Sequence, residues 1–230
     1  MRPARDRLAR FLLALFLLTA AVDLLCLAVG LDTGHTVAKP LLMPLLAACA
    51  VLRGTPRLLV AALLFGWGGD VLLLSEADPA FLAGMACFAL GHVCYLALFT
   101  RSGEKTVPRA RAGVLALGYT AALVTTVALL WPDLPADLRV PVAGYSLLLT
   151  AMAYLAALRL GLVAGLGGAL FVLSDTLIAT GVADWPQLPA PDFWVMLTYI
   201  TAQALLAGAV LGRVGPRLQG AAPVRPRLTT

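Results

Sequence analysis

Residues 58–74 read LLVAALLFGWGGDVLLL, an apolar stretch long enough for a membrane helix that a single acidic side chain, Asp70, interrupts. An aspartate at the centre of a membrane helix costs roughly 2.5–3.5 kcal/mol on insertion scales, so an ionisable residue there indicates a functional site. Such a residue needs a partner. The candidate partners from other apolar stretches are Lys39, Asp175 and Asp23.

The composition of the whole chain excludes an ordinary soluble domain. Of its 230 residues, 61% are hydrophobic and 13% are charged, whereas soluble domains are roughly 45–50% apolar. We therefore predict an integral membrane protein. Lys and Arg occur in small groups between apolar runs and form no continuous basic stripe, so we predict no nucleic-acid partner. The cysteines show no C-x-x-C spacing and are interpreted as small core residues.

Eight apolar stretches predict an all-α membrane protein, an eight-transmembrane-helix bundle. Residues 1–211 would form this single bundle, and residues 212–230, rich in Arg and Pro, a disordered basic tail. The first stretch is too long, and too interrupted by Asp23, for a cleavable signal peptide. The predicted spans are residues 11–29, 37–52, 58–74, 79–99, 112–130, 138–158, 162–180 and 193–211.

The distribution of basic residues predicts the orientation of these spans. With a cytoplasmic N-terminus, every Lys and Arg except Lys39 and Arg139 falls on the cytoplasmic side, as the positive-inside rule requires. We therefore expect both termini to be cytoplasmic and the protein to lie in the bacterial inner (plasma) membrane. No internal repeat is evident, which disfavours an inverted-repeat transporter.

This orientation predicts the depth of the polar residues inside the spans. At about 1.5 Å per residue, Asp70, Asp175, Asp23 and Lys39 lie about 5–10 Å inside the outer ends of four helices and share one layer. Tyr199 and Gln203 are four residues apart, so they share a helix face and would form the floor of that layer. His92 lies deeper, either as a packed histidine bonded to a carbonyl or as part of the site.

Two interpretations of the charged layer remain. An ion pair between Lys39 and one aspartate could simply fasten two helices, but it leaves two acids uncompensated. Alternatively, one buried aspartate keeps its proton beside an ionised aspartate held by Lys39, which is an acid and base pair. With only His35 and His92 in the chain, a three-histidine zinc site cannot form, and there is no G-x-S-x-G motif. We predict no metal and no cofactor.

Several motifs, taken in order, resemble the lysoplasmalogenase-like (YhhN) family of multi-pass membrane proteins. They are Lys39-Pro40-Leu41-Leu42, Gly69-Asp70-Val71-Leu72-Leu73-Leu74, the stretch 81–99 with Gly84, Phe88, His92 and Tyr95, Gly168-Ala169-Leu170-Phe171-Val172-Leu173-Ser174-Asp175, and Tyr199-Ile200-Thr201-Ala202-Gln203. Together they cover helices two to eight.

The resemblance implies a metal-independent ether hydrolase. It would cleave the vinyl ether bond of lysoplasmalogens to a fatty aldehyde and a glycerophospho-ethanolamine or glycerophosphocholine. Asp70 and Asp175 would be the catalytic acid and base, in an order that the resemblance leaves open. The substrate-binding residues would be Lys39, Tyr199, Gln203 and His92. We add Asp23 to this set only because it lies at the same depth in the membrane.

Partners implied by this interpretation are a lysophospholipid substrate and the lipid bilayer; the oligomeric state stays open. A proton-coupled small-solute transporter is the alternative, because the same layer could relay protons. It predicts a polar path to the inner face, whereas the inner halves of the spans, which contain His92, Tyr95 and Tyr154, are mainly apolar. A non-catalytic lipid-binding protein is the third possibility.

Overall fold

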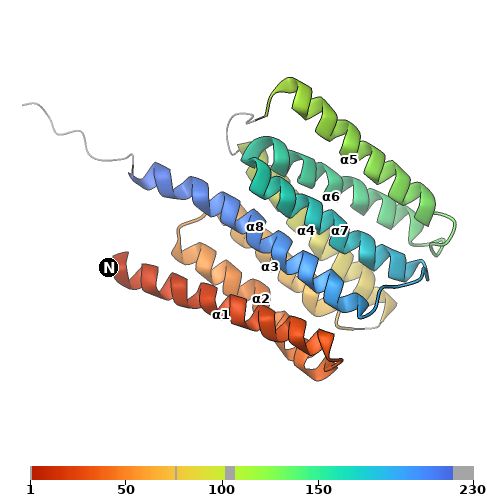
Figure 1. Cartoon of the computed structure of the whole chain (residues 1–230), viewed down its shortest axis with the longest axis horizontal. Helices are drawn as coiled ribbons and strands as arrows, with labels where there is room; N and C mark the ends of the chain where they lie inside the picture. Colours follow the sequence, from red (N-terminus) through yellow and green to blue (C-terminus); the bar gives the residue numbers. More distant parts are fainter. Residues whose placement is uncertain (1, 76, 102–106, 220–230) are drawn as a thin grey trace, which may run out of the picture.

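The computed structural model describes residues 2–75, 77–101 and 107–219, and these form eight helices without a strand. The helices lie side by side in one bundle (Figure 1). The predicted all-α bundle is therefore confirmed. The helices are α1 (Arg2–Ala28), α2 (Asp32–Leu52), α3 (Arg57–Leu72), α4 (Asp78–Arg101), α5 (Arg109–Leu130), α6 (Arg139–Leu160), α7 (Leu162–Val182) and α8 (Pro191–Gln219).

Length and apolar composition identify 7 membrane-spanning helices within the described residues. The remaining one, α3, has 16 residues and reaches about 24 Å at 1.5 Å per residue, less than the hydrocarbon thickness of about 30 Å. It nevertheless packs against α2 and α4 as the other helices pack against their neighbours. The chain is an integral, multi-pass membrane protein, and its shortest helix carries Asp70.

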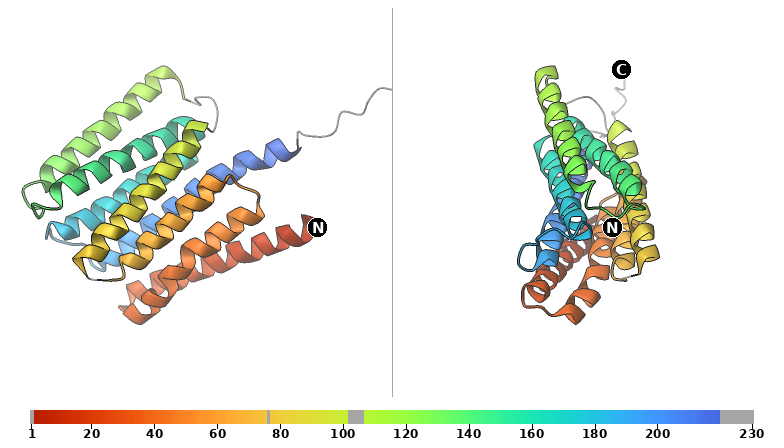
Figure 2. Two further views of the ribbon diagram at one scale, coloured as in Figure 1. Left: turned by 180° about the vertical axis from the view of Figure 1, so that it is seen from behind. Right: turned by 90° about the vertical axis from the view of Figure 1, so that its right-hand side faces the viewer.

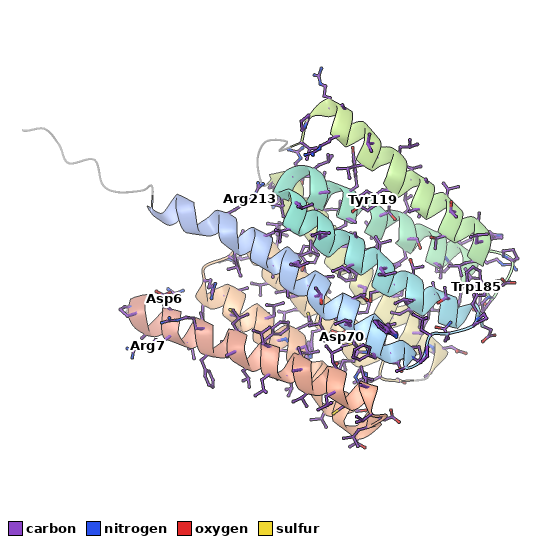
Figure 3. All side chains as sticks on the ribbon, viewed as in Figure 1. Asp6, Arg7, Asp70, Tyr119, Trp185 and Arg213 are labelled. Carbon is purple, nitrogen blue, oxygen red and sulfur yellow. The ribbon has the colours of Figure 1, made fainter. Side chains whose placement is uncertain are left out.

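The first and the last helix place both ends of the chain on the same side of the molecule. The start of α1 and the end of α8 are at one end of the bundle in Figure 1. Figure 3 shows Asp6, Arg7 and Arg213 toward that end and Trp185 at the opposite one. Helix α8 continues past residue 211 to Gln219, so the beginning of the predicted disordered tail is helical. The rest of that tail, residues 220–230, lies outside the described residues.

Helix α2 begins earlier than the sequence predicted. The connection between the predicted spans 11–29 and 37–52 is confined to residues 29–31. Gly30 has a φ of 72°, and the Leu31 amide donates to the Cys26 carbonyl at 2.8 Å. A positive φ is accessible to glycine without steric cost, so one residue suffices to reverse the chain. Pro40 and Pro44 therefore lie inside the helix, where packing against neighbouring membrane helices offsets the lost backbone bonds.

The main core forms where α1, α2, α3, α4, α6, α7 and α8 meet. Its largest fully buried side chains include Phe99, Phe171, Met43, Met152 and Leu206. Helix α5 is peripheral: Leu130 is its one buried side chain in the described part of the chain, and the helix packs against α6 and α7 alone. The end-on view of Figure 2 shows α5 at the edge of the bundle. Most side chains of α5 are therefore not buried against the other helices.

Glycine and alanine bring α6 and α7 together in the halves that lie nearer to the chain termini. A Cβ atom on Gly168 would lie 2.7 Å from the Cα atom of Ala153 and 2.9 Å from its Cβ atom. Small residues at such a position allow two membrane helices to approach closely. The opposite halves of the same helices carry larger side chains, including Tyr145 and Asp175. The close contact therefore closes this part of the bundle on the side of the chain termini.

We expect Gly168→Ala to destabilise the purified protein by about 1–3 kcal/mol, because the added methyl group would overlap backbone that cannot move aside. The measurement is the thermal unfolding temperature in detergent. Gly118→Ala on α5 is the matched control, since a Cβ atom there meets nothing within 4 Å among the described residues. Equal unfolding temperatures for the two variants would contradict the close α6–α7 contact.

Candidate active site

A chain of hydrogen bonds ends on Asp70. The Tyr95 hydroxyl of α4 donates to Oε1 of Gln203 at 2.6 Å, and Nε2 of Gln203 donates to the Tyr199 hydroxyl at 3.3 Å. The Tyr199 hydroxyl in turn donates to Oδ2 of Asp70 at 2.8 Å. All four side chains are buried. Because every donor points toward Asp70, this arrangement suits a carboxylate that bears the negative charge.

The glycines around Asp70 allow its neighbours to approach. A Cβ atom on Gly66 would lie 3.1 Å from both Nε2 of Gln203 and the Tyr199 hydroxyl. On Gly69 it would lie 2.5 Å from the Phe88 ring. The glycine-rich sequence before Asp70 therefore creates room for α8 on one face of α3 and for α4 on the other.

A second network joins Asp175 to His92 through Tyr145. The Tyr145 hydroxyl of α6 donates to Oδ2 of Asp175 on α7. It also bonds Nε2 of His92 on α4 at 3.0 Å. Nδ1 of His92 is buried and has no hydrogen-bond partner among the described residues. If Tyr145 donates to Asp175, Nε2 of His92 carries the proton, and Nδ1 is the bare nitrogen.

Aromatic rings connect the two networks without a hydrogen bond between them. Phe171 packs edge-on against both His92 and Tyr199, with ring centroids 4.8 and 5.4 Å away. Phe88 packs edge-on against Tyr199 at 5.9 Å. The carboxyl groups of Asp70 and Asp175 still interact electrostatically. The two acids therefore lie in one apolar region, each with its own tyrosine.

The other two charged residues of the predicted layer differ in their contacts. Asp23 is fully buried, and its Oδ1 bonds Nδ1 of His35 at 2.8 Å. Lys39 is half-buried and forms no ion pair within 4 Å in the described part of the chain. Both interact electrostatically with Asp70. A direct ion pair between Lys39 and an aspartate, which both interpretations of the layer assumed, is thus wrong for the described residues, where His35 holds Asp23 instead.

A pocket that is partly open to the outside lies between α4, α5, α6 and α7. Asp175 and Tyr145 line it, whereas Asp70 and Lys39 do not. The walls are otherwise mainly apolar and include Leu73, Phe81, Met85, Phe88, Ala122, Leu123, Val127, Leu130, Val142, Leu149, Val172, Ile178, Ala179 and Val182, with hydroxyl groups from Thr126, Ser146, Thr150 and Thr176.

The pocket occupies the halves of its helices that lie farther from the chain termini. Leu130 and Val182 are the last residues of α5 and α7, at the end of the bundle opposite to the chain termini. The deepest lining residues, Thr150 and Val172, lie about 15 Å below the ends of their helices at 1.5 Å per residue. The close contact of Ala153 with Gly168 begins just below them. The pocket is therefore one-sided.

The sequence analysis predicted most of the polar residues in these hydrogen-bond networks, but it missed Tyr145 and His35. Tyr145 lies six residues past Arg139, or about 9 Å from the start of α6, at the depth of Asp175. The same arithmetic that found the aspartates would therefore have found it. His35 falls between the predicted spans 11–29 and 37–52, but it lies in the first turn of α2, where it reaches Asp23. His92 bonds the Tyr145 hydroxyl rather than a backbone carbonyl.

Within the described ranges, no group of three or more His, Cys, Asp and Glu side chains is arranged to hold a metal ion. The polar groups at the pocket are a carboxyl, a phenol and several hydroxyls. Such groups donate and accept protons and hydrogen bonds. The arrangement can therefore carry out acid–base chemistry on an apolar molecule.

The fold and this site define a multi-pass helical membrane protein with carboxyl groups buried beside an apolar pocket that faces one side of the membrane. Comparison with known protein families shows which family the chain belongs to. Residues 34–210 match the YhhN family, and the chain belongs to that family. No solved structure matches it.

Related proteins come from mammals and bacteria. Lysoplasmalogenase TMEM86B of Sus scrofa is 36% identical over 174 residues, which cover 73% of this chain and 72% of the pig protein. The human protein of the same name is 35% identical over 164 residues, with 71% and 68% covered. Lysoplasmalogenase of Mycobacterium tuberculosis is 34% identical over 201 residues, with 80% and 75% covered.

Proposed function

We propose that this protein is a lysoplasmalogenase, a membrane hydrolase that cleaves the vinyl ether bond of lysoplasmalogens. The relatives named above support the activity, and the geometry supports the chemistry. The observation that carries the proposal is the meeting of Asp175 and Tyr145 at the wall of an otherwise apolar pocket. There a proton donor faces space that fits a hydrocarbon chain.

Asp175 is the proposed catalytic acid. Its proton transfers to the vinyl carbon that is not bonded to oxygen, and the electron pair of the double bond forms the new C–H bond. The remaining oxocarbenium ion takes up water at the carbon next to oxygen, and that water gives a proton back to the Asp175 carboxylate. The resulting hemiacetal loses its hydroxyl proton as its bond to the glycerol oxygen breaks, and the glycerol oxygen takes up a proton, giving a fatty aldehyde and a glycerophospho-ethanolamine or glycerophosphocholine. General acid catalysis of this kind contributes roughly 10²–10⁴ in rate.

Tyr145 and His92 are the proposed positioning residues for that acid. When Asp175 is ionised after giving its proton to the substrate, Tyr145 donates to the carboxylate, and Nε2 of His92 donates to the Tyr145 oxygen. The two hydrogen bonds thus orient the carboxyl group and stabilise its ionised form.

Asp70 is the proposed negative charge that stabilises the oxocarbenium ion. It lies at the end of the donor chain from Tyr95 through Gln203 and Tyr199. Lys39 supplies a nearby positive charge. These groups favour the ionised form of Asp70, while the apolar surroundings strengthen its field at the pocket. Because Asp70 does not line the pocket, it acts through its charge rather than by contact.

The lipid would lie with its head group toward the outer end of the bundle and its chain among the apolar walls. We further propose that both termini face the cytoplasm of a bacterial inner membrane. Arg5, Arg7, Arg10 and Arg213 belong to the end where both termini lie, in agreement with the positive-inside rule. The pocket would then open toward the external face.

The experiment is aldehyde release by the purified protein from 1-alkenyl lysophosphatidylethanolamine and from 1-alkenyl lysophosphatidylcholine. The 1-acyl lipids of equal chain length are the controls, since they lack the vinyl ether. We expect aldehyde from the alkenyl lipids and no hydrolysis of the acyl lipids. A folded protein that releases no aldehyde from either alkenyl lipid would refute the proposal, and uptake of a solute by proteoliposomes would then favour a transporter.

A further inference from the structure

A second hollow lies on the outer surface of the bundle, between α4 and α6. These helices run side by side on the face seen in the left view of Figure 2. Val140 and Leu82 at its rim are 72% and 42% exposed, so the hollow faces the surroundings of the bundle. It is lined by Leu82, Met85, Ala86, Ala89, Val140, Pro141, Gly144, Tyr145 and Leu148. We call it the α4–α6 groove.

The α4–α6 groove and the pocket share two residues. Met85 and Tyr145 line both spaces. These two side chains therefore form the wall between the surface of the bundle and the pocket that contains Asp175. Methionine is unbranched and flexible, so it fills a gap in several conformations. A wall of this kind can open without movement of the helices.

The groove lies at the depth of the reacting groups. Its α6 residues extend from Val140 to Leu148, the second to the tenth residue of the helix, or about 2–14 Å from the outer end at 1.5 Å per residue. Asp175 lies seven residues before the end of α7, at about 10 Å. The groove therefore faces the outer half of the bilayer core, where the hydrocarbon chain of a lipid lies.

The chemistry of the lining fits a hydrocarbon chain. Apart from Tyr145, the groove residues within the described chain carry no polar side-chain group. A lysophospholipid moving from the bilayer keeps its head group at the interface and its chain in the apolar core. A path through water would expose that chain, whereas a side path between two helices keeps it in apolar surroundings.

We propose that the α4–α6 groove is the lateral portal through which the hydrocarbon chain of the substrate passes between the bilayer and the pocket. The inference rests on the proposed function, because it names the route to that same site. Met85 forms the movable part of the wall. The fatty aldehyde, which is as apolar as the chain that enters, leaves by the same route.

Gly144 offers a way to fill the groove without disturbing the fold. It is exposed in the groove, and a Cβ atom there meets nothing within 4 Å among the described residues. Gly144→Phe therefore places a ring in the groove rather than in the core. Gly208→Phe on α8 is the matched control, because Gly208 is also exposed and also has open space at Cβ but lies outside the groove.

The first test compares aldehyde release from a long-chain alkenyl lysolipid in phosphatidylcholine vesicles with release from a short-chain, water-soluble analogue. We expect Gly144→Phe to slow release from vesicles at least about tenfold and to change release from the soluble analogue less than about twofold. Gly208→Phe should behave as wild type with both. Equal rates for Gly144→Phe and wild type in vesicles, or an equal loss with both substrates, would overturn the portal.

The second test works without turnover and so separates the portal from the proposed activity. A 1-alkyl lysophosphatidylethanolamine with a diazirine in its chain has no vinyl ether and labels residues it contacts under light. We expect label on α4 and α6 groove residues that excess unlabelled 1-alkyl lysolipid competes away and diacyl lipid does not. Gly144→Phe should reduce it at least about fivefold, and Gly208→Phe should not. If Gly144→Phe were labelled as strongly as wild type, the portal proposal would be wrong, whether or not wild type releases aldehyde.

Discussion

Asp175→Asn is expected to lower the turnover of alkenyl lysolipid by about 10²–10⁴-fold. Asparagine has the shape of aspartate, and its side-chain oxygen still accepts the hydrogen bond from Tyr145. It cannot transfer an acidic proton to carbon. The loss should therefore appear in kcat, with KM changed less, because the apolar walls that hold the chain stay intact.

The measurement is steady-state aldehyde release, accompanied by two controls of the same variant. Its thermal unfolding temperature in detergent should stay near that of wild type. Its labelling by the diazirine lipid should also be unchanged, because binding precedes proton transfer. A variant that keeps its fold and retains turnover within about threefold of wild type would exclude Asp175 as the acid.

Asp70→Asn is expected to lower turnover by roughly 10²-fold, the size of effect seen when one preorganised electrostatic group is removed from an active site. Asparagine keeps a hydrogen-bond acceptor for Tyr199, so the donor chain persists. The negative charge is lost. Because Asp70 does not line the pocket, binding of the diazirine lipid should be unaffected.

Tyr199→Phe separates the charge of Asp70 from its hydrogen bond. It removes the donor at 2.8 Å but leaves the carboxyl group. We expect a loss of about tenfold, smaller than for Asp70→Asn. If Asp70→Asn lost stability in detergent but kept its turnover, Asp70 would be a structural residue, and the oxocarbenium ion would need another partner.

The sequence predicted the helices well because membrane spans follow from length and apolar composition alone. Their ends were predicted less well. Helix α2 begins at Asp32 because one glycine at position 30 reverses the chain, and helix α8 continues to Gln219. Such boundaries depend on local backbone geometry, which an apolar run does not encode.

Depth along each helix was also accessible from the sequence, since every residue adds about 1.5 Å. That rule placed Asp23, Lys39, Asp70 and Asp175 in one layer, and Asp70 does interact electrostatically with the other three. Depth does not specify rotation of a helix about its axis or which helices are neighbours. The sequence therefore predicted one cluster, whereas the aspartates have separate hydrogen-bond partners in Tyr199, Tyr145 and His35.

By itself, then, the sequence determined that this is a helical membrane protein with ionisable side chains buried near one end, and its motifs indicated the family. Only the tertiary structure decided that Asp175 lines a pocket while Asp70 is enclosed, and that Tyr145 stands between that pocket and the surface. The physical reason is that the insertion of a helix into the membrane depends on how apolar its own residues are. A pocket and its wall depend instead on the angles and distances at which several helices pack.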